Sequence, residues 1–424
     1  MTEYLASSVN YAPTIPLRTV AEYFAGIGLV RMGLETQGWQ ITYANDISLK
    51  KYELYKGFYP DANHHYVVDD IFNLDPTTIP ATLLATCSFP CVDLSLAGNM
   101  RGIEGEHSSA FWGFIRILKE KGSNSPPMIL VENVTGWLHS NKGKDFRLTV
   151  KALNELGYAC DVFALDALRF TPQSRPRVFL VGTRFGIKQS SSGILARSKS
   201  LLPDQLRRSV CQNDDLAWYS LDLPEPPSMR KTGLSTIVEK LSESDSRWWS
   251  EVEIQRHLNM MDARHKERIV EISLQKKYSY RTFFRRRRNG QQRAEVRYDD
   301  LAGCLRTASG GSGKQFLVKA GKGEIHMRAM TPREYARLQG VPDNFFISKN
   351  GVQALTGFGD AVCVPVINWI TQYALNPLLD ACRADPIIAN FSIKYYVEST
   401  EKIDLQQFWR VHKAGQTSFL EDHG

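Results

Sequence analysis

The chain lacks the cysteine pattern of a disulfide scaffold. Its seven cysteines, at positions 87, 91, 160, 211, 304, 363 and 382, are scattered, odd in number and contain no Cys-x-x-Cys pair. This spacing argues against a disulfide framework and against a zinc site, and it favours a reducing compartment. We therefore expect no structural metal and at most an individual reactive thiol.

Long hydrophobic runs are also absent. The longest apolar stretches have the length of strands, which predicts no membrane-spanning helix. The first residues, MTEYLASSVNYAPTIPLRT, contain neither a basic head nor an apolar run, so no secretory signal is expected. A composition of 43% hydrophobic and 23% charged residues is typical of a soluble globular protein. The net charge of +7 suits a polyanionic partner without identifying one.

Residues 18–185 alternate short apolar runs with helical spacing. We expect helices over 29–37 and 111–119 between the strands. Alternation of this kind indicates a doubly wound α/β fold, a mainly parallel sheet with helices on both faces, whose ligands gather at the carboxyl ends of the strands. The runs interpreted as strands are Thr19–Phe24, Ile41–Asn45, Leu83–Ser88, Met128–Glu132 and Arg177–Thr183.

The pattern changes after residue 185. A serine-rich connector, a proline-rich turn, an amphipathic segment over 254–275 and a basic run follow, which predict a smaller inserted domain. Helical signals return at Thr331, a capping residue followed by Pro332, and again near Pro365. The expected organisation is an N-terminal extension (1–17), a larger domain (18–185), the inserted domain (186–326), a return to the larger domain (327–384) and a polar tail (385–424).

A glycine-containing turn follows the first strand. Phe24-Ala25-Gly26-Ile27-Gly28 lies between that strand and a helix, and Asp46 ends the next strand, where it could hold ribose hydroxyls. Any doubly wound fold can have such a turn. Arg31 stands where a dinucleotide fingerprint has its third glycine, which argues against a pyrophosphate cofactor and permits one without phosphates, such as S-adenosylmethionine. Asp70 is either a contact to the adenine amino group or a surface aspartate.

Three further segments place reactive side chains at the ends of expected strands. An isolated cysteine is usually a small buried hydrophobe, but Cys91 follows a strand end and the stiffening Pro90, where this architecture places its site. Glu132, in Glu132-Asn133-Val134, ends an apolar strand and must be paired or solvated. Arg175 and Arg177 share one side of an extended segment. They form either surface ion pairs or contacts to a base and a phosphate.

Together these motifs resemble the C5-cytosine DNA methyltransferases, in the compact form of bacterial restriction–modification systems. Six segments occur in the family's order over roughly residues 18–376, with a variable stretch between the fourth and fifth. The chain departs from the family pattern at Val92, Leu94 and Asp360. The segments are Phe24–Gly28, Pro90-Cys91, Glu132-Asn133-Val134, Gln173–Arg177, Arg328–Pro342 and Gly357–Pro365.

The resemblance implies a mechanism and a cofactor. The Cys91 thiolate would add to C6 of a flipped cytosine, Glu132 would contact N3 and the exocyclic amine, Arg177 would hold O2, and Arg175 would orient the site and steady the thiolate. S-adenosylmethionine would supply the methyl group. The residues expected at the cofactor are Phe24, Ala25, Gly26, Gly28, Asp46, Ile47, Asp70, Ile71, Pro90 and Asp360.

The inserted domain is expected to recognise double-stranded DNA. Between Arg264 and Arg297 there are twelve Lys/Arg against three Asp/Glu. Such a run is often only a solvated face, but here phosphate contact is the interpretation that we favour. The protein would act in the bacterial cytoplasm at the nucleoid, in a system where a cognate restriction endonuclease would work separately. The expected DNA-contacting residues are Arg285, Arg286, Arg287, Arg288, Arg306, Ser309, Gly310 and Gly311.

Three other functions compete with this one. A cytosine-5 tRNA methyltransferase would share the fold, but the variable stretch of about 140 residues favours a DNA target. A catalytically silent DNA-binding module is disfavoured because Cys91, Glu132 and Arg177 are all present. A nicotinamide-dependent oxidoreductase is disfavoured because the third glycine is missing.

Overall fold

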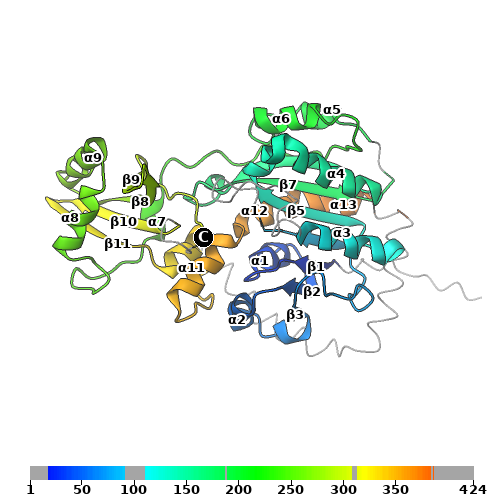
Figure 1. Ribbon diagram of the computed structural model, residues 1–424, viewed down its shortest axis with the longest axis horizontal. Coiled ribbons are helices and arrows are strands. Elements are labelled where there is room, and N and C mark those ends of the chain that lie inside the picture. Colours follow the sequence, from blue (N-terminus) through cyan, green and yellow to red (C-terminus); the bar gives the residue numbers. More distant parts are fainter. Residues whose placement is uncertain (1–17, 91–109, 187–188, 308–312, 383–384, 386–424) are drawn as a thin grey trace, which may run out of the picture.

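The computed structural model describes residues 18–90, 110–186, 189–307, 313–382 and 385, which form two sheets with their helices (Figure 1). The larger sheet has seven strands in the order β3-β2-β1-β4-β5-β7-β6. Strands β1 to β5 pair in parallel, whereas β7 is antiparallel to β5 and β6. The strands are β1 (Thr19–Tyr23), β2 (Gln40–Asp46), β3 (Tyr66–Val68), β4 (Leu84–Cys87), β5 (Met128–Val134), β6 (Ala159–Asp166) and β7 (Pro176–Thr183).

Helices cover both faces of this sheet, which confirms the predicted doubly wound class. Successive side chains of a strand point to opposite faces, so Val20 packs in one core and its neighbour Ala21 in the other. The first face carries α1 (Leu29–Glu35), α2 (Leu49–Phe58), α12 (Val364–Ile370) and α13 (Asn376–Ala381). The second face carries α3 (Ala110–Lys121), α4 (Lys144–Glu155), α5 (Ser192–Leu195) and α6 (Asp204–Cys211).

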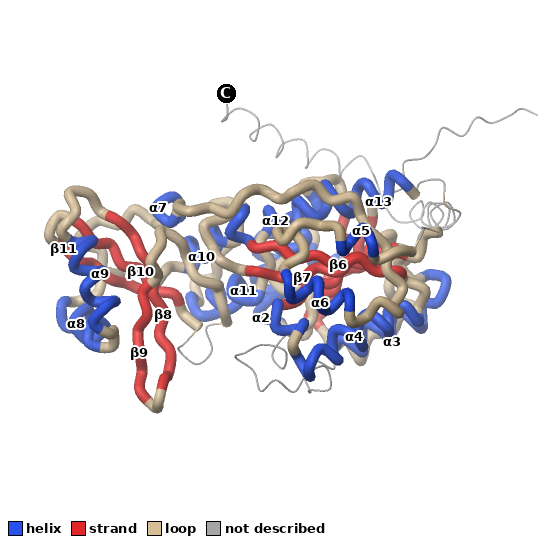
Figure 2. The backbone as a smooth tube through the Cα atoms, turned by 90° about the horizontal axis from the view of Figure 1, so that it is seen from above, coloured by secondary structure: helices blue, strands red, loops and turns tan. Residues whose placement is uncertain are grey.

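The smaller sheet is antiparallel, in the order β11-β10-β8-β9. Its hairpin of β8 (Ser279–Arg288) and β9 (Gln291–Val296) projects from the body of the small domain (Figure 2). One face packs against α8 (Glu251–Asn259) and α9 (Ala263–Ser273). The remaining strands are β10 (Gln315–Gly321) and β11 (Glu324–Ala329).

A third core joins the two domains. Leu317 of β10 points away from α8 and α9 and packs with Ile27 and Leu29, which flank the start of α1. Short helix α7 (Leu234–Ile237) and helices α10 (Pro332–Leu338) and α11 (Gly351–Asp360) complete this core. The small domain is therefore held beside the glycine-containing turn, at the carboxyl ends of the central strands.

The packing shifts both predicted edges of the inserted domain. Residues after 186 first return to the large sheet, because Ile194, Leu206 and Trp218 are buried in the core beneath α3 and α4. At the other end, the boundary predicted after residue 326 falls inside β11, which pairs with β10 up to Ala329. We therefore propose that the smaller domain begins after about residue 222 and ends at 329.

Several local predictions can be compared with the helices and strands directly. Thr331 and Glu334 form the predicted capping box at the start of α10, and Pro365 lies in the first turn of α12. The amphipathic segment predicted over 254–275 contains parts of two helices, α8 and α9, and Asp262 caps the start of α9 with its side chain. Strand β6 and helices α2 and α4 were not predicted.

One helical stretch qualifies as a membrane span by length and composition. It runs from Gly351 to Ala381 in the described part of the chain and joins α11, α12, a π-helical turn and α13. About 72% of its apolar window is buried inside the fold. It is therefore a core element, and its apolar character is explained by packing.

Candidate active site and cofactor pocket

The turn after β1 is held in a conformation that opens it to a ligand. Phe24 and Gly26 both have positive φ, +58° at each, so the chain reverses sharply there. A non-glycine residue in this region is strained, and such strain is concentrated at functional sites. Among the described residues, a Cβ on Gly26 would meet one atom within 4 Å, the Phe24 carbonyl oxygen at 3.9 Å, so these residues leave space for a ligand over its backbone.

At Gly28, glycine is required by the close packing of neighbouring side chains. Its φ is +81°, and an added Cβ would lie 2.6–2.8 Å from the rings of Tyr59 and Tyr55. The Tyr59 hydroxyl also donates to the Gly28 carbonyl at 2.8 Å. Gly28 therefore permits close packing of α1 on α2. Arg31, at the place of the missing third glycine, fills the same interface, where it pairs with Glu35 and Asp61 and stacks on Tyr59.

Asp46 organises the glycine-containing turn from the end of β2. Its two carboxylate oxygens accept hydrogen bonds from the backbone N–H of Gly26 at 3.0 Å and of Ser48 at 2.9 Å. The side chain is buried. Each oxygen retains a further lone pair, so a ribose contact remains open to it, but its observed role is to position the turn.

The other residues expected at the cofactor differ in exposure. Ile47 is 68% exposed at the start of α2, which suits contact with a planar ring. Asp70 accepts a hydrogen bond from the Phe72 N–H at 3.0 Å. Ile71 is buried beneath α3, where its side chain fills the space left by Gly113. The Ile71 side chain is thus a core element, and Ala25 is likewise buried in the core.

The segment that leads to Cys91 is anchored where β4 and β5 end. Cys91 itself lies outside the described residues. The Phe89 ring packs on Phe111 and Trp137, and its carbonyl accepts from the Asn133 side chain at 3.5 Å. Pro90 follows and is exposed. Asn133, which was not among the predicted site residues, therefore ties this segment to Glu132.

Glu132 and Arg177 form an ion pair at the same edge of the sheet. Arg177 Nε lies 2.9 Å from Glu132 Oε1, and the two side chains are only 13% and 11% exposed. Strands β5 and β7 run antiparallel, so the end of β5 meets the beginning of β7. The structure thus brings together two of the four predicted catalytic residues, next to the segment that leads to Cys91.

Arg175 joins three parts of the molecule. Its guanidinium donates to the Leu305 carbonyl at 2.8 Å and to the Gly359 carbonyl at 3.1 Å, and its backbone N–H donates to Asp166 at 2.6 Å. The side chain is buried, and burial, with the charge of Arg177, lowers its pKa. It therefore fastens the segment after β9 and the end of α11 to the large domain.

A second cysteine lies beside these arginines. Arg175 Nη1 is 3.5 Å from Cys304 Sγ. Burial would raise the pKa of the Cys304 thiol, but the positive charges of Arg175, Arg177 and Arg306 outweigh it, and the net shift is downward. The sequence around Cys304 carried no signal of this, because Arg175 and Arg177 are more than a hundred residues away along the chain.

A charged cluster connects Asp46 with Asp360. Lys51 Nζ lies 3.2 Å from Asp360 Oδ2 and 3.9 Å from Asp46 Oδ2. The Thr307 hydroxyl donates to the other oxygen of Asp360 at 3.0 Å. Lys51 and Thr307 were not among the predicted site residues. No motif marks them, because the three segments that meet here are distant in the sequence.

The basic run of the small domain is divided between the two faces of β8. Arg285 lies over the Phe316 ring, and Arg286 pairs with Glu295. Arg287 and Arg288 are exposed near the hairpin tip. A groove of about 410 Å³ lies alongside, lined by Arg264, Arg286, Arg288, Arg297, Phe284 and Tyr298 among others. Arg306 is exposed, whereas Ser309, Gly310 and Gly311 lie outside the described residues.

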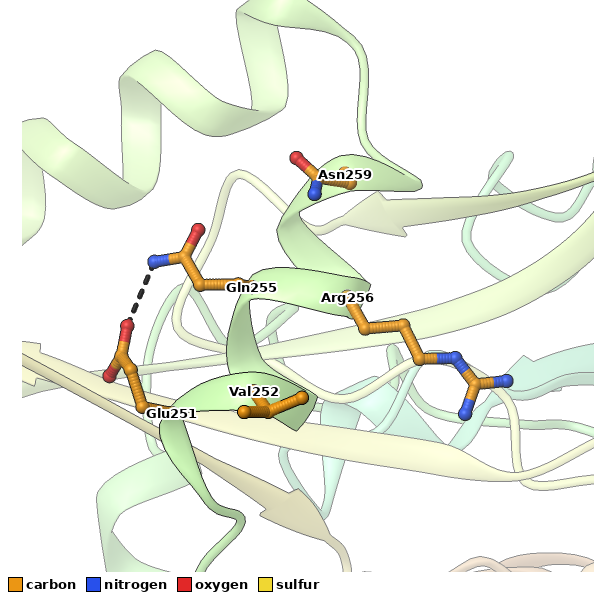
Figure 3. A pocket seen from close by; sticks show the side chains of 5 residues that line it. All are labelled: Glu251, Val252, Gln255, Arg256 and Asn259. Atoms are coloured by element: carbon orange, nitrogen blue, oxygen red, sulfur yellow. Dashed lines mark hydrogen bonds between the residues drawn. The ribbon is translucent and has the colours of Figure 1, made fainter.

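Another depression lies on α8, at the end of the molecule away from the large sheet (Figures 1 and 3). Its lining comes from one helix, where Gln255 donates to Glu251 at 2.8 Å. It includes none of the predicted site residues. Within the described residues no group of three or more His, Cys, Asp or Glu could hold a metal ion.

Comparison with known proteins identifies the family. The sequence profile of the C-5 cytosine-specific DNA methylases matches residues 18–375. The chain belongs to this family, whose members are S-adenosylmethionine-dependent methyltransferases. The resemblance inferred from the sequence motifs is thereby confirmed.

Individual relatives agree with the family match. The chain is 27% identical to the type II methyltransferase M1.ScrFI of Lactococcus lactis subsp. cremoris, over 84% of this chain and 78% of the relative. It is 24% identical to the type II methyltransferase M.HhaI of Haemophilus parahaemolyticus, over 82% and 91%. The crystal structure of the S. pombe Dnmt2 methyltransferase shares the fold, with a TM-score of 0.54 and 20% identity over 85% of this chain and 99% of that one.

Proposed function

We propose that the protein transfers a methyl group from S-adenosylmethionine to C5 of a cytosine that is flipped out of a specific duplex DNA sequence, with Cys91 as the nucleophile. The observation that carries this proposal is the Glu132–Arg177 pair, 2.9 Å apart beside the segment that leads to Cys91. A carboxylate and a guanidinium side by side complement the donor and acceptor edges of a pyrimidine. The setting would be a restriction–modification system or a methylase that acts alone.

The chain's own residues would activate the base. The Cys91 thiolate adds to C6, so electron density moves to C5 and N3. Glu132 contacts N3 and the exocyclic amine and stabilises the ring as this charge develops. Arg177 holds O2 from the other side. After C5 has been methylated its proton leaves to a base, the electron pair re-forms the C5–C6 double bond, and the bond from C6 to sulfur breaks.

The residues around β1 fit the proposed cofactor. Space over the Gly26 backbone admits a ligand, and Asp46 and the exposed Ile47 lie at the neighbouring strand end. Asp70 and the backbone around Ile71 and Pro90 would border the same pocket. When bound there, S-adenosylmethionine supplies an electrophilic methyl group on a sulfonium. The glycine-containing turn would hold that methyl group at the carboxyl ends of β1 and β4.

The small domain would hold the duplex. Arg287 and Arg288 at the hairpin, with the arginines of the adjoining groove, would contact phosphates. Arg285 and Arg286 would contribute less than the exposed Arg287, because Arg285 lies over the Phe316 ring and Arg286 pairs with Glu295, which Arg288 also approaches at 3.6 Å. Arg306, with Ser309, Gly310 and Gly311, would approach the bases. A cognate endonuclease would act separately, in a bacterial cytoplasm.

The decisive assay measures transfer of a tritiated methyl group from S-adenosylmethionine to duplex DNA and, in parallel, to tRNA. We expect incorporation into DNA only, at cytosine C5. Incorporation into tRNA alone would favour the RNA methyltransferase, and binding of DNA without transfer to either would favour the silent module. Bisulfite sequencing of a host genome that expresses the protein would then identify the target sequence.

A further inference from the structure

Lys51 occupies a position that is electrostatically unfavourable for a lysine. It lies in the first turn of α2, where its backbone N–H is capped by the Ser48 side chain. The amino end of a helix carries partial positive charge, so a cation is disfavoured there. Its side chain is only 27% exposed. Burial alone would lower the pKa of Lys51, but the carboxylates of Asp46 and Asp360 reverse this and raise it.

The cluster around Lys51 unites segments of both domains. Asp46 comes from the end of β2, Lys51 from α2 and Asp360 from the end of α11, while Thr307 lies in the small domain, between β9 and β10. Two carboxylates and one ammonium give these groups a net charge of −1. The backbone N–H of Gly26 also bonds to Asp46, so the open space over Gly26 adjoins the cluster.

The chemistry of the proposed methyl donor complements this arrangement. Its amino-acid end carries one carboxylate and one ammonium, which require a cation and an anion as neighbours. Lys51 and Asp360 provide such a pair 3.2 Å apart. The donor's net charge of +1, from its sulfonium, also suits a cluster whose three charged side chains sum to −1.

We propose that Lys51 is a specificity-determining residue for the amino-acid end of S-adenosylmethionine: it binds the carboxylate, beside Asp360, which the family resemblance already places at the cofactor and which is left to take the ammonium. The inference rests on the proposed function. The pair observed between the two side chains would separate to admit the zwitterion, each side chain exchanging one charged partner for another. The family often has asparagine at the position of Asp360. A neutral amide would bind an ammonium group more weakly than the Asp360 carboxylate does.

A purely structural ion pair would behave differently. A bridge that only tied α2 to α11 would affect every adenosine ligand alike, because its loss would disturb Asp46 and the whole pocket. A contact to the amino-acid end affects only ligands that carry the carboxylate. The two roles are therefore separated by truncating the ligand rather than the protein.

The test is isothermal titration calorimetry of the full chain with S-adenosylmethionine and with its decarboxylated form, which retains the sulfonium and the amine. We expect the wild-type protein to prefer S-adenosylmethionine by at least tenfold in Kd, and Lys51→Met to reduce that preference to threefold or less. Lys50→Met, in the same turn but exposed, is the matched control and should leave the preference unchanged.

The outcomes separate this inference from the function on which it rests. Equal weakening of both ligands by Lys51→Met, or an unchanged preference, would overturn the inference and leave the methyl donor in place. Absence of any binding of S-adenosylmethionine to the wild-type chain would overturn the proposed function and the inference together. Thermal denaturation of each variant establishes that it is folded, and Asp360→Asn, expected to weaken both amine-bearing ligands, provides a second variant.

Discussion

Arg175 is a junction residue, because its side chain joins the segments that contain Leu305 and Gly359 to the start of β7. Replacement of Arg175 by lysine should loosen these contacts while the positive charge is kept. The guanidinium makes two good hydrogen bonds, to the Leu305 and Gly359 carbonyls at 2.8 and 3.1 Å, and these carbonyls belong to different segments. A single ammonium on a shorter stem cannot reach both. A hydrogen bond from a charged donor contributes about 1.5–3 kcal/mol. Because the lysine loses one of the two bonds, we expect Arg175→Lys to reduce the free energy of unfolding by about 1.5–3 kcal/mol.

Equilibrium unfolding in urea, followed by tryptophan fluorescence, measures this loss, and hydrogen–deuterium exchange locates it. In Arg175→Lys, backbone amide hydrogens of residues 301–307 and 357–361 should exchange faster than in the wild type. Arg169→Lys is the control, because Arg169 donates to a single carbonyl, that of Pro227, at the surface. If Arg175→Lys were within about 0.5 kcal/mol of the wild type, the range of neutral surface substitutions, or if the control lost as much, the interpretation of Arg175 as a junction residue would be refuted.

Two further predictions concern buried charges. Glu334→Gln should cost about 3–5 kcal/mol in urea unfolding, because it leaves the completely buried Arg328 uncompensated; a loss below about 1 kcal/mol would contradict this. Burial raises the pKa of Glu22 from 4.5 to about 8. The stability that its neutral form contributes is complete below pH 4.5 and is lost as the pH rises towards 8. Glu22→Gln should therefore gain stability over the wild type between pH 5 and 8, by roughly 4 kcal/mol, and a pH-independent difference in thermal melting would refute this.

The central strands were predictable because each is a run of apolar residues between turn signals. Strand β6 was not, because Asp161 interrupts its run, and only the tertiary structure shows that Arg197 neutralises this buried aspartate. The amphipathic spacing of 254–275 hid the break at Asp262, since a capping aspartate and a surface aspartate look alike in sequence.

The site was predictable to the extent that strand ends determine it. Glu132 lies near the end of β5 and Arg177 near the start of β7, and the apolar pattern locates both strands. Because these two strands pair in the sheet, the two side chains lie close together. Contacts between segments that are distant in the sequence and do not pair in a sheet were not predictable in this way. The partners of Arg175, and the meeting of Lys51 with Asp360, depend on how α11 and the segment after β9 pack against the large sheet.

The most direct test of the central claim is covalent trapping on duplex DNA in which the target cytosine is replaced by 5-fluorocytosine, whose C5 fluorine cannot leave as a proton does. In the presence of S-adenosylmethionine, intact-mass measurement should show a stable protein–DNA complex for the wild type and for Cys304→Ser, and none for Cys91→Ser. A trapped complex that persists in Cys91→Ser, or that disappears only in Cys304→Ser, would contradict the assignment of Cys91 as the nucleophile.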